Sequence, residues 1–77
     1  MQDENYINIF CKFVGKLVQD GKLTVKEGFA VLRIFEPECE KITSRQDLIN
    51  FIDSHLGYYW ELKALRQKLA DPHYNFN

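Results

Sequence analysis

The sequence Lys22-Leu23-Thr24-Val25-Lys26-Glu27 is nearly repeated nineteen positions later as Lys41-Ile42-Thr43-Ser44-Arg45-Gln46. In each copy a threonine hydroxyl can accept a hydrogen bond from the backbone N–H three residues on. The side chain at that third position, Glu27 or Gln46, can reach back to the N–H of the threonine. Each copy therefore predicts the start of a helix, and we interpret them as two independently capped helices. Nineteen residues hold only one helix and its joint, which is too short for a solenoid repeat.

Apolar residues recur at helical spacing along most of the chain. The pattern predicts an all-α protein with helices at about 5–19, 25–35, 44–56 and 58–70, followed by a tail over 71–77. Asp20-Gly21, Pro37, Gly57 and Asp71-Pro72 separate these helices. Because the joints are short, we expect an up-and-down four-helix bundle or a small orthogonal helical array forming one domain.

The second predicted helix is apolar around most of its circumference, which is typical of a central helix. By the correspondence of the two capped helices, Phe29 matches Leu48 and Leu32 matches Phe51, so all four are expected on inner faces. Gly28 lowers the helix propensity, and its missing side chain would let a neighbouring helix come close.

Composition limits the classes of function. Among 77 residues, 45% are hydrophobic and 14% aromatic, which is enough for a real core. The formal net charge is −1, so the chain lacks the basic excess that nucleic acids or anionic membranes select. The longest apolar run, Phe29 to Leu32, is far shorter than the roughly 20 residues of a membrane span. Two cysteines and a polar, acidic start predict a reduced, cytoplasmic protein.

The first joint resembles the second half of an EF-hand calcium loop. If Gly21 takes the sixth loop position, Asp20 is the fifth, Thr24 the ninth and Glu27 the twelfth. The resemblance covers about twelve residues and implies an EF-hand-like pair of helices. The first and third positions hold Lys16 and Val18, which supply no ligand oxygen, so we expect no calcium.

No other group of residues suggests chemistry. Cys11, Cys39, His55 and His73 could donate to zinc, but none is paired at the short spacing of structural zinc sites. We interpret them as small buried hydrophobes and core or boundary histidines, with Cys11 on or beside an apolar helix face. Neither cysteine has neighbours that would activate a thiolate. We therefore expect no catalysis, no metal and no cofactor.

The fourth predicted helix gives the main functional hypothesis. A stripe of Tyr58, Leu62, Leu65 and Leu69 should face the interior, which places Trp60 on the opposite side. Aromatic and arginine side chains often dominate protein interfaces. We predict a partner-binding face made of Tyr59, Trp60, Lys63, Arg66 and Gln67. An alternative is that the tail His73-Tyr74-Asn75-Phe76, or the first helix, covers Trp60.

Two further features leave alternatives open. Glu36, Glu38 and Glu40 form an acidic joint that is either a solvated loop or a contact for a basic partner. The tight joint from Asp20 to Thr24 also suits a helix-turn-helix nucleic-acid-binding regulator, although the helix after it is very apolar. We expect a small non-catalytic interaction or regulatory module that binds a protein partner or a second copy of itself.

Overall fold

The computed structural model describes residues 5–76, in which helices are joined by short turns and loops and no strand is present. The elements are α1 Tyr6–Gln19, α2 Val25–Phe35, η1 Glu36–Lys41, α3 Arg45–His55, η2 Trp60–Leu62 and α4 Lys63–Ala70, where η denotes a 3-10 helix. The predicted all-α class is confirmed. Residues 1–4 and Asn77, the last residue of the predicted tail, lie outside the described range.

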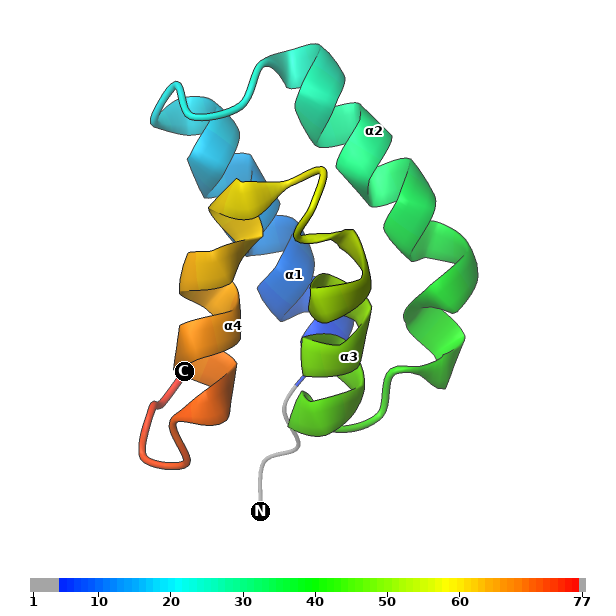
Figure 1. Cartoon of the computed structure of the whole chain (residues 1–77), viewed down its shortest axis with the longest axis vertical. Helices are drawn as coiled ribbons and strands as arrows, with labels where there is room; N and C mark the ends of the chain where they lie inside the picture. Colours follow the sequence, from blue (N-terminus) through cyan, green and yellow to red (C-terminus); the bar gives the residue numbers. More distant parts are fainter. Residues whose placement is uncertain (1–4, 77) are drawn as a thin grey trace.

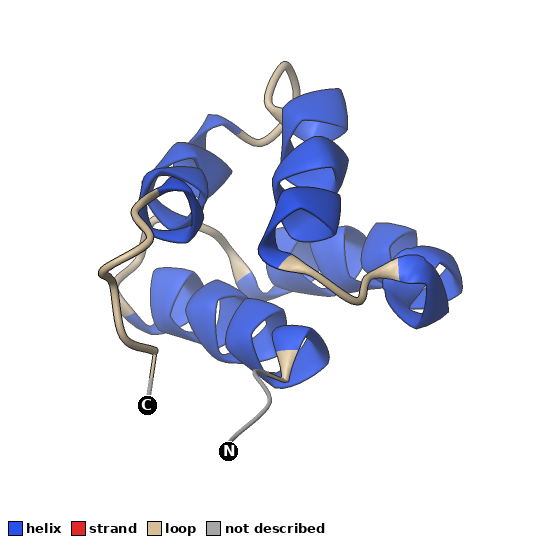
Figure 2. Ribbon diagram, turned by 90° about the horizontal axis from the view of Figure 1, so that it is seen from below, coloured by secondary structure: helices blue, strands red, loops and turns tan. Residues whose placement is uncertain are grey.

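The helices form two antiparallel hairpins, α1 with α2 and α3 with α4 (Figure 1). The two hairpins are inclined to each other instead of lying parallel, as the view from below shows (Figure 2). Of the two predicted arrangements, the structure is therefore the helical array. No described helix combines the length and the apolar character needed to cross a membrane.

Three phenylalanines from three helices form the centre of the core. The Phe10 ring stacks on Phe35 with centroids 4.2 Å apart, and Phe51 meets both edge-on at 5.6 and 5.3 Å. Within residues 5–76 no polar or charged side chain is buried. The buried hydrophobic residues are Phe10, Val14, Leu17, Leu23, Val31, Phe35, Ile42, Leu48, Ile49, Phe51, Ile52, Leu62, Leu65 and Leu69.

The joint between α1 and α2 is a tight turn, with a left-handed glycine after α1 and a capping box at the start of α2. Gly21 has a φ of 77°, a left-handed conformation that suits glycine. The predicted capping box is present at Thr24. Its hydroxyl accepts from the N–H of Glu27 at 3.1 Å, and the Glu27 carboxylate accepts from the Thr24 N–H at 2.9 Å. Because both contacts are local, the sequence predicted this start correctly.

The second predicted capping box is wrong by one residue. Helix α3 is capped by Ser44, whose hydroxyl accepts from the Asp47 N–H at 3.1 Å. Asp47 then accepts from the backbone N–H of Thr43 at 3.0 Å, so the reciprocal bond reaches the residue before the cap. Gln46 instead donates to Asn50 along the helix at 2.9 Å.

We expect alanine substitutions at the helix caps to destabilise the protein to different extents. Thr24→Ala and Ser44→Ala each remove the hydroxyl that accepts from the first turn, and each should cost about 0.5 to 2 kcal/mol. Thr43→Ala should cost less, because the Thr43 backbone N–H still donates to Asp47. Urea unfolding followed by circular dichroism measures all three. An equal or larger loss for Thr43→Ala than for Ser44→Ala would contradict the observed cap.

Asp47 also predicts a dependence of stability on pH. Its pKa is lowered, mainly by the hydrogen bond from the Thr43 backbone N–H. A carboxylate with a lowered folded pKa stabilises fully above its unfolded pKa, near 4, and loses that contribution as pH falls through the folded value. The difference in unfolding midpoint between wild type and Asp47→Asn should therefore be constant above about pH 5 and shrink in more acidic buffer. A difference that grows on acidification would contradict this assignment.

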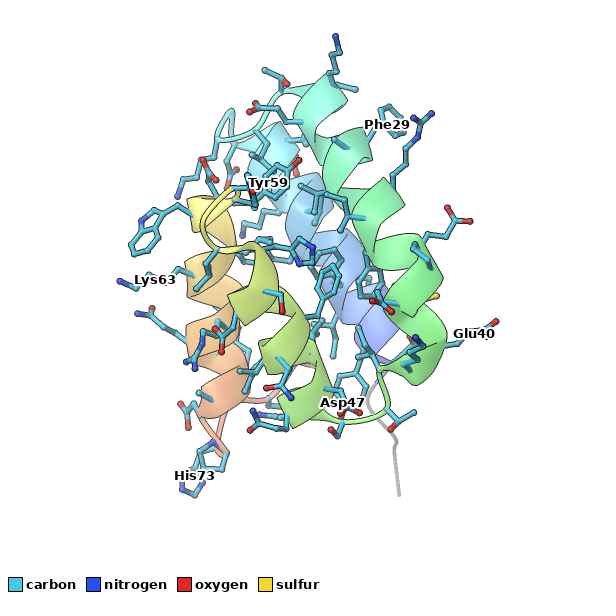
Figure 3. All side chains as sticks on the ribbon, turned by 45° about the vertical axis from the view of Figure 1, so that its right-hand side comes forward. Phe29, Glu40, Asp47, Tyr59, Lys63 and His73 are labelled. Atoms are coloured by element: carbon cyan, nitrogen blue, oxygen red, sulfur yellow. The ribbon has the colours of Figure 1, made fainter. Side chains whose placement is uncertain are left out.

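The inner side of α2 differs from the prediction at Phe29. Gly28, Val31 and Phe35 are the buried residues of α2, whereas Phe29 is 65% exposed and points away from the array (Figure 3). The reason is the close approach at Gly28. A Cβ built there would lie 2.7 Å from Cγ2 of Val18 on α1. The predicted close packing at Gly28 thus turns Phe29 outward.

Candidate partner-binding site

The segment predicted as one helix over 58–70 is broken at its start. The carbonyl of His55 accepts from the N–H groups of both Tyr58 and Tyr59, at 3.0 and 2.9 Å. Because of this turn, helical structure resumes only at Trp60, with η2 followed by α4. Tyr58 is therefore 84% exposed, and its predicted place in the inner stripe is wrong, while Leu62, Leu65 and Leu69 are buried as predicted.

Trp60 lies at the solvent-facing start of η2. Its side chain is 63% exposed, and the ammonium Nζ of Lys63 lies 4.4 Å from the ring centroid. A cation–π contact at an exposed site contributes about 0.5 to 1 kcal/mol, enough to favour one orientation of the indole. The structure thus presents a largely exposed indole to solvent, with Lys63 over its ring.

Only part of the predicted partner-binding face lies together. Trp60, Lys63 and Gln67 line one hollow, which α4 shares with α1. Tyr59 is half-buried, packs against the core, and lines a small hollow together with residues of α2 and α3 that include Phe51. Tyr59 therefore does not belong to the same surface as Trp60.

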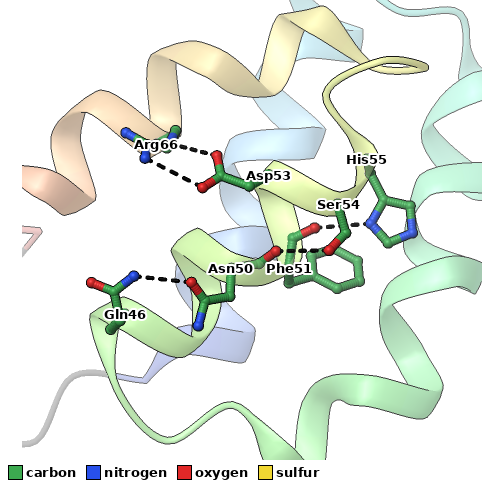
Figure 4. A network of polar contacts seen from close by, with 7 residues as sticks. All are labelled: Gln46, Asn50, Phe51, Asp53, Ser54, His55 and Arg66. Atoms are coloured by element: carbon green, nitrogen blue, oxygen red, sulfur yellow. Dashed lines mark hydrogen bonds and ion pairs between the residues drawn. The ribbon is translucent and has the colours of Figure 1, made fainter.

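Arg66 also faces away from that hollow. Its Nε donates to Oδ1 of Asp53 on α3, and a second guanidinium nitrogen donates to Oδ2 at 3.3 Å (Figure 4). This bidentate pair joins α4 to α3, and it raises the pKa of Arg66 chiefly through the hydrogen bond. Arg66 therefore belongs to the α3–α4 contact and does not line the hollow of Trp60, Lys63 and Gln67.

The residues that complete the site come from α1, and sequence reasoning missed them. Two connected hollows, of about 490 and 520 Å³, run between α1 and α4 and share Phe13, Lys16 and Lys68. We call this surface the α1–α4 groove. Lys12 and Lys16 are four residues apart and flank Phe13, a spacing that places all three on one side of a helix. This spacing is the feature of the sequence from which the α1 side of the site could have been predicted.

The C-terminal segment closes the far end of the groove and leaves Trp60 open. Arg45 donates to the carbonyls of Asp71 and Tyr74, each at 2.8 Å, and lies over the Phe76 ring at 5.1 Å. Tyr74 and Phe76 line the end of the groove distant from Trp60. The alternative that residues 73–76 cover Trp60 is therefore wrong.

Cys11 and Cys39 influence each other, whereas His55 has different surroundings. Cys11 is exposed on α1, contrary to the predicted apolar surroundings, and Cys39 is half-buried. Partial desolvation, and secondarily Cys39, raise the pKa of Cys11, whereas an activated thiolate requires a lowered pKa. The half-buried His55 donates from Nδ1 to the Phe51 carbonyl at 2.9 Å (Figure 4). Among residues 5–76, no three His, Cys, Asp or Glu side chains are grouped to hold a metal ion.

The acidic joint is the turn η1, at the end of α2. Glu36, Glu38 and Glu40 are all exposed there, and Glu38 pairs with Lys41 at 3.6 Å. Glu40 and Lys63 point to opposite sides of the molecule (Figure 3). The near-neutral chain therefore separates its charge, with an acidic turn on one side and lysines around the α1–α4 groove.

Comparison with protein-family models, with curated proteins and with solved structures gives no match. Function is therefore inferred from the geometry of the site alone, because a helical array by itself does not specify an activity.

Proposed function

We propose that this protein is a small non-catalytic interaction module that binds a protein partner through the part of α4 centred on Trp60. The observation that carries the proposal is the exposure of Trp60, which is 63% exposed even though Lys63 lies over its ring. Tryptophan is strongly enriched among the residues that dominate the binding energy of interfaces. Lys63 and Gln67 beside it supply polar contacts for the rim of such an interface.

The surroundings of Trp60 fit this role. The indole stands at one end of a groove, so a partner can surround it and exclude water from both the ring and the groove floor. Well-packed, desolvated pockets are where interface residues contribute most. The acidic turn on the opposite side would stay free for solvent or for a second contact.

Substitution of Trp60 tests the proposal, with Phe29 as a matched control. The two aromatic side chains are almost equally exposed, at 63% and 65%, but only Trp60 lines the groove. Trp60→Ala should weaken partner binding by about 2 kcal/mol or more, roughly 30-fold in Kd, while Phe29→Ala leaves it unchanged.

The partner is captured by placing a photo-crosslinking amino acid at Gln67 in the source cells. We expect a crosslinked protein, or a crosslinked second copy of this chain, that disappears with Trp60→Ala and persists with Phe29→Ala. Light scattering on the purified chain distinguishes the second copy from another protein. Loss with Phe29→Ala and retention with Trp60→Ala would assign binding to α2 and refute the proposal.

A further inference from the structure

The α1–α4 groove has a strong excess of positive charge. Five of the ten Lys and Arg residues of the chain line it, with Asp20 and Glu61 as its only carboxylates among the described residues. Both carboxylates belong to the hollow at the Trp60 end. The lining lysines are Lys12, Lys16, Lys22, Lys63 and Lys68.

The groove also has an apolar floor and the length of a secondary-structure element. Phe13, Leu17 and Leu65 contribute to its floor between the lysines. Along α1 the lining residues run from Asn5 to Asp20, which corresponds to about 22 Å of helix rise. A partner helix of about 16 residues has this length.

The lysines and rings are arranged in a way that favours a peptide over a nucleic acid. The ammonium of Lys68 lies between two rings, 5.7 Å from Phe13 and 5.4 Å from Tyr74, and that of Lys63 lies over Trp60. Single-stranded nucleic acids bind by stacking bases on open aromatic faces. Here ammonium groups already occupy faces of these rings, which leaves less open ring surface for base stacking. Partner carboxylates can pair with the same lysines without displacing them.

We infer that the α1–α4 groove binds an acidic amphipathic segment of the partner protein. The inference rests on the proposed function and adds the chemistry of the partner. Carboxylates of the segment pair with Lys12, Lys16 and Lys68, and its apolar side chains contact Phe13 and the indole of Trp60. Charge complementarity supports this occupant, since lysines form most of the charged lining.

Selection from a display library of random peptides, each of about 16 residues, tests the inference with the full chain as bait. The selected peptides should be acidic and should also carry Leu, Phe or Trp. Their binding, followed by isothermal titration calorimetry, should weaken markedly between about 50 and 300 mM salt. The charge reversal Lys12→Glu with Lys16→Glu should weaken binding about tenfold or more. The matched reversal Lys26→Glu with Arg33→Glu on α2 should not, and circular dichroism checks that both variants fold.

Other outcomes would overturn the inference. One is a selection that yields no peptides, or only neutral or basic ones; another is binding that survives reversal of Lys12 and Lys16. Tighter binding of a single-stranded oligouridylate than of the selected peptides would assign the groove to nucleic acid. Self-association abolished by reversal either of the groove lysines or of Glu36 and Glu40 would assign it to a second copy.

The two proposals can fail separately. If the crosslink at Gln67 depends on Trp60 but not on Lys12 and Lys16, the interaction module stands and the acidic partner is refuted. If acidic peptides need the lysines while Trp60→Ala changes neither the crosslink nor the affinity, the groove stands and the role of Trp60 is refuted.

Discussion

Phe10→Ala is expected to destabilise this protein strongly. Phe10 is 0% exposed, stacks on Phe35 and meets Phe51 edge-on, so its loss opens a cavity at the contact of three helices. Replacing a buried phenylalanine by alanine costs about 3 to 5 kcal/mol. A chain of 77 residues has a free energy of unfolding of about 4 to 12 kcal/mol. We expect Tm to fall by about 12 °C or more, measured by thermal unfolding with circular dichroism.

The same substitution at Phe29 is the control. Because that ring is exposed, Phe29→Ala should change the free energy of unfolding by no more than about 0.5 kcal/mol. If Phe10→Ala fails to fold, Phe10→Leu keeps most of the volume and should cost about 1 to 2 kcal/mol. Equal effects at Phe10 and Phe29 would contradict the central position of the Phe10 ring.

The contrast between Phe10 and Phe29 indicates what periodicity alone could predict. The bounds of α1 and α2 follow from local signals, namely Asn5 and Thr24 as N-caps and Pro37 after the end of α2. The buried face of α2 could not be predicted from its own sequence, because it depends on how α2 packs against other helices. Analogy with α3 predicts one buried stripe for α2, but the approach of α1 at Gly28 selects a different one.

The start of α3 shows the same limit. Thr43 and Ser44 are both capable caps, and the sequence favoured the one with Gln46 three residues on. In the structure Ser44 is the cap, and Arg45 follows it with hydrogen bonds to carbonyls 26 and 29 residues away. Hydrogen bonds between segments that are far apart in the sequence cannot be predicted from a local sequence pattern.

The candidate site was predicted in part for a related reason. Helical spacing placed Trp60, Lys63 and Gln67 correctly relative to the buried leucines of α4. It could not assign Arg66, because Asp53 belongs to another helix, nor find Lys16, because the packing of α1 beside α4 is tertiary. The pairing of the α1 side of the groove with α4 could therefore be identified only from the structure.

Gly28→Leu is the second substitution with a large expected effect. The Cβ that it adds would lie 2.7 Å from Cγ2 of Val18 and 3.7 Å from Cγ1 of Val14, and three more carbons follow. Valine side chains in helices are stiff, and Val14 is 1% exposed, so these neighbours cannot move aside freely. Helices α1 and α2 must separate. We expect a cost of about 3 kcal/mol or more, at the upper end for overpacking, measured by urea unfolding.

Gly28→Ala with and without Val18→Ala tests whether this contact is the cause. In an open helix, replacing glycine by alanine stabilises by up to about 1 kcal/mol. Here the clash opposes that gain, so Gly28→Ala should destabilise by about 1 kcal/mol. Val18→Ala removes the clashing methyl group, and the double variant should be more stable than the sum of the two losses by at least about 0.5 kcal/mol. Stabilisation by Gly28→Ala alone would mean that α1 and α2 lie farther apart at this point. Because α1 carries Phe13, Lys12 and Lys16, the same result would also displace one wall of the α1–α4 groove.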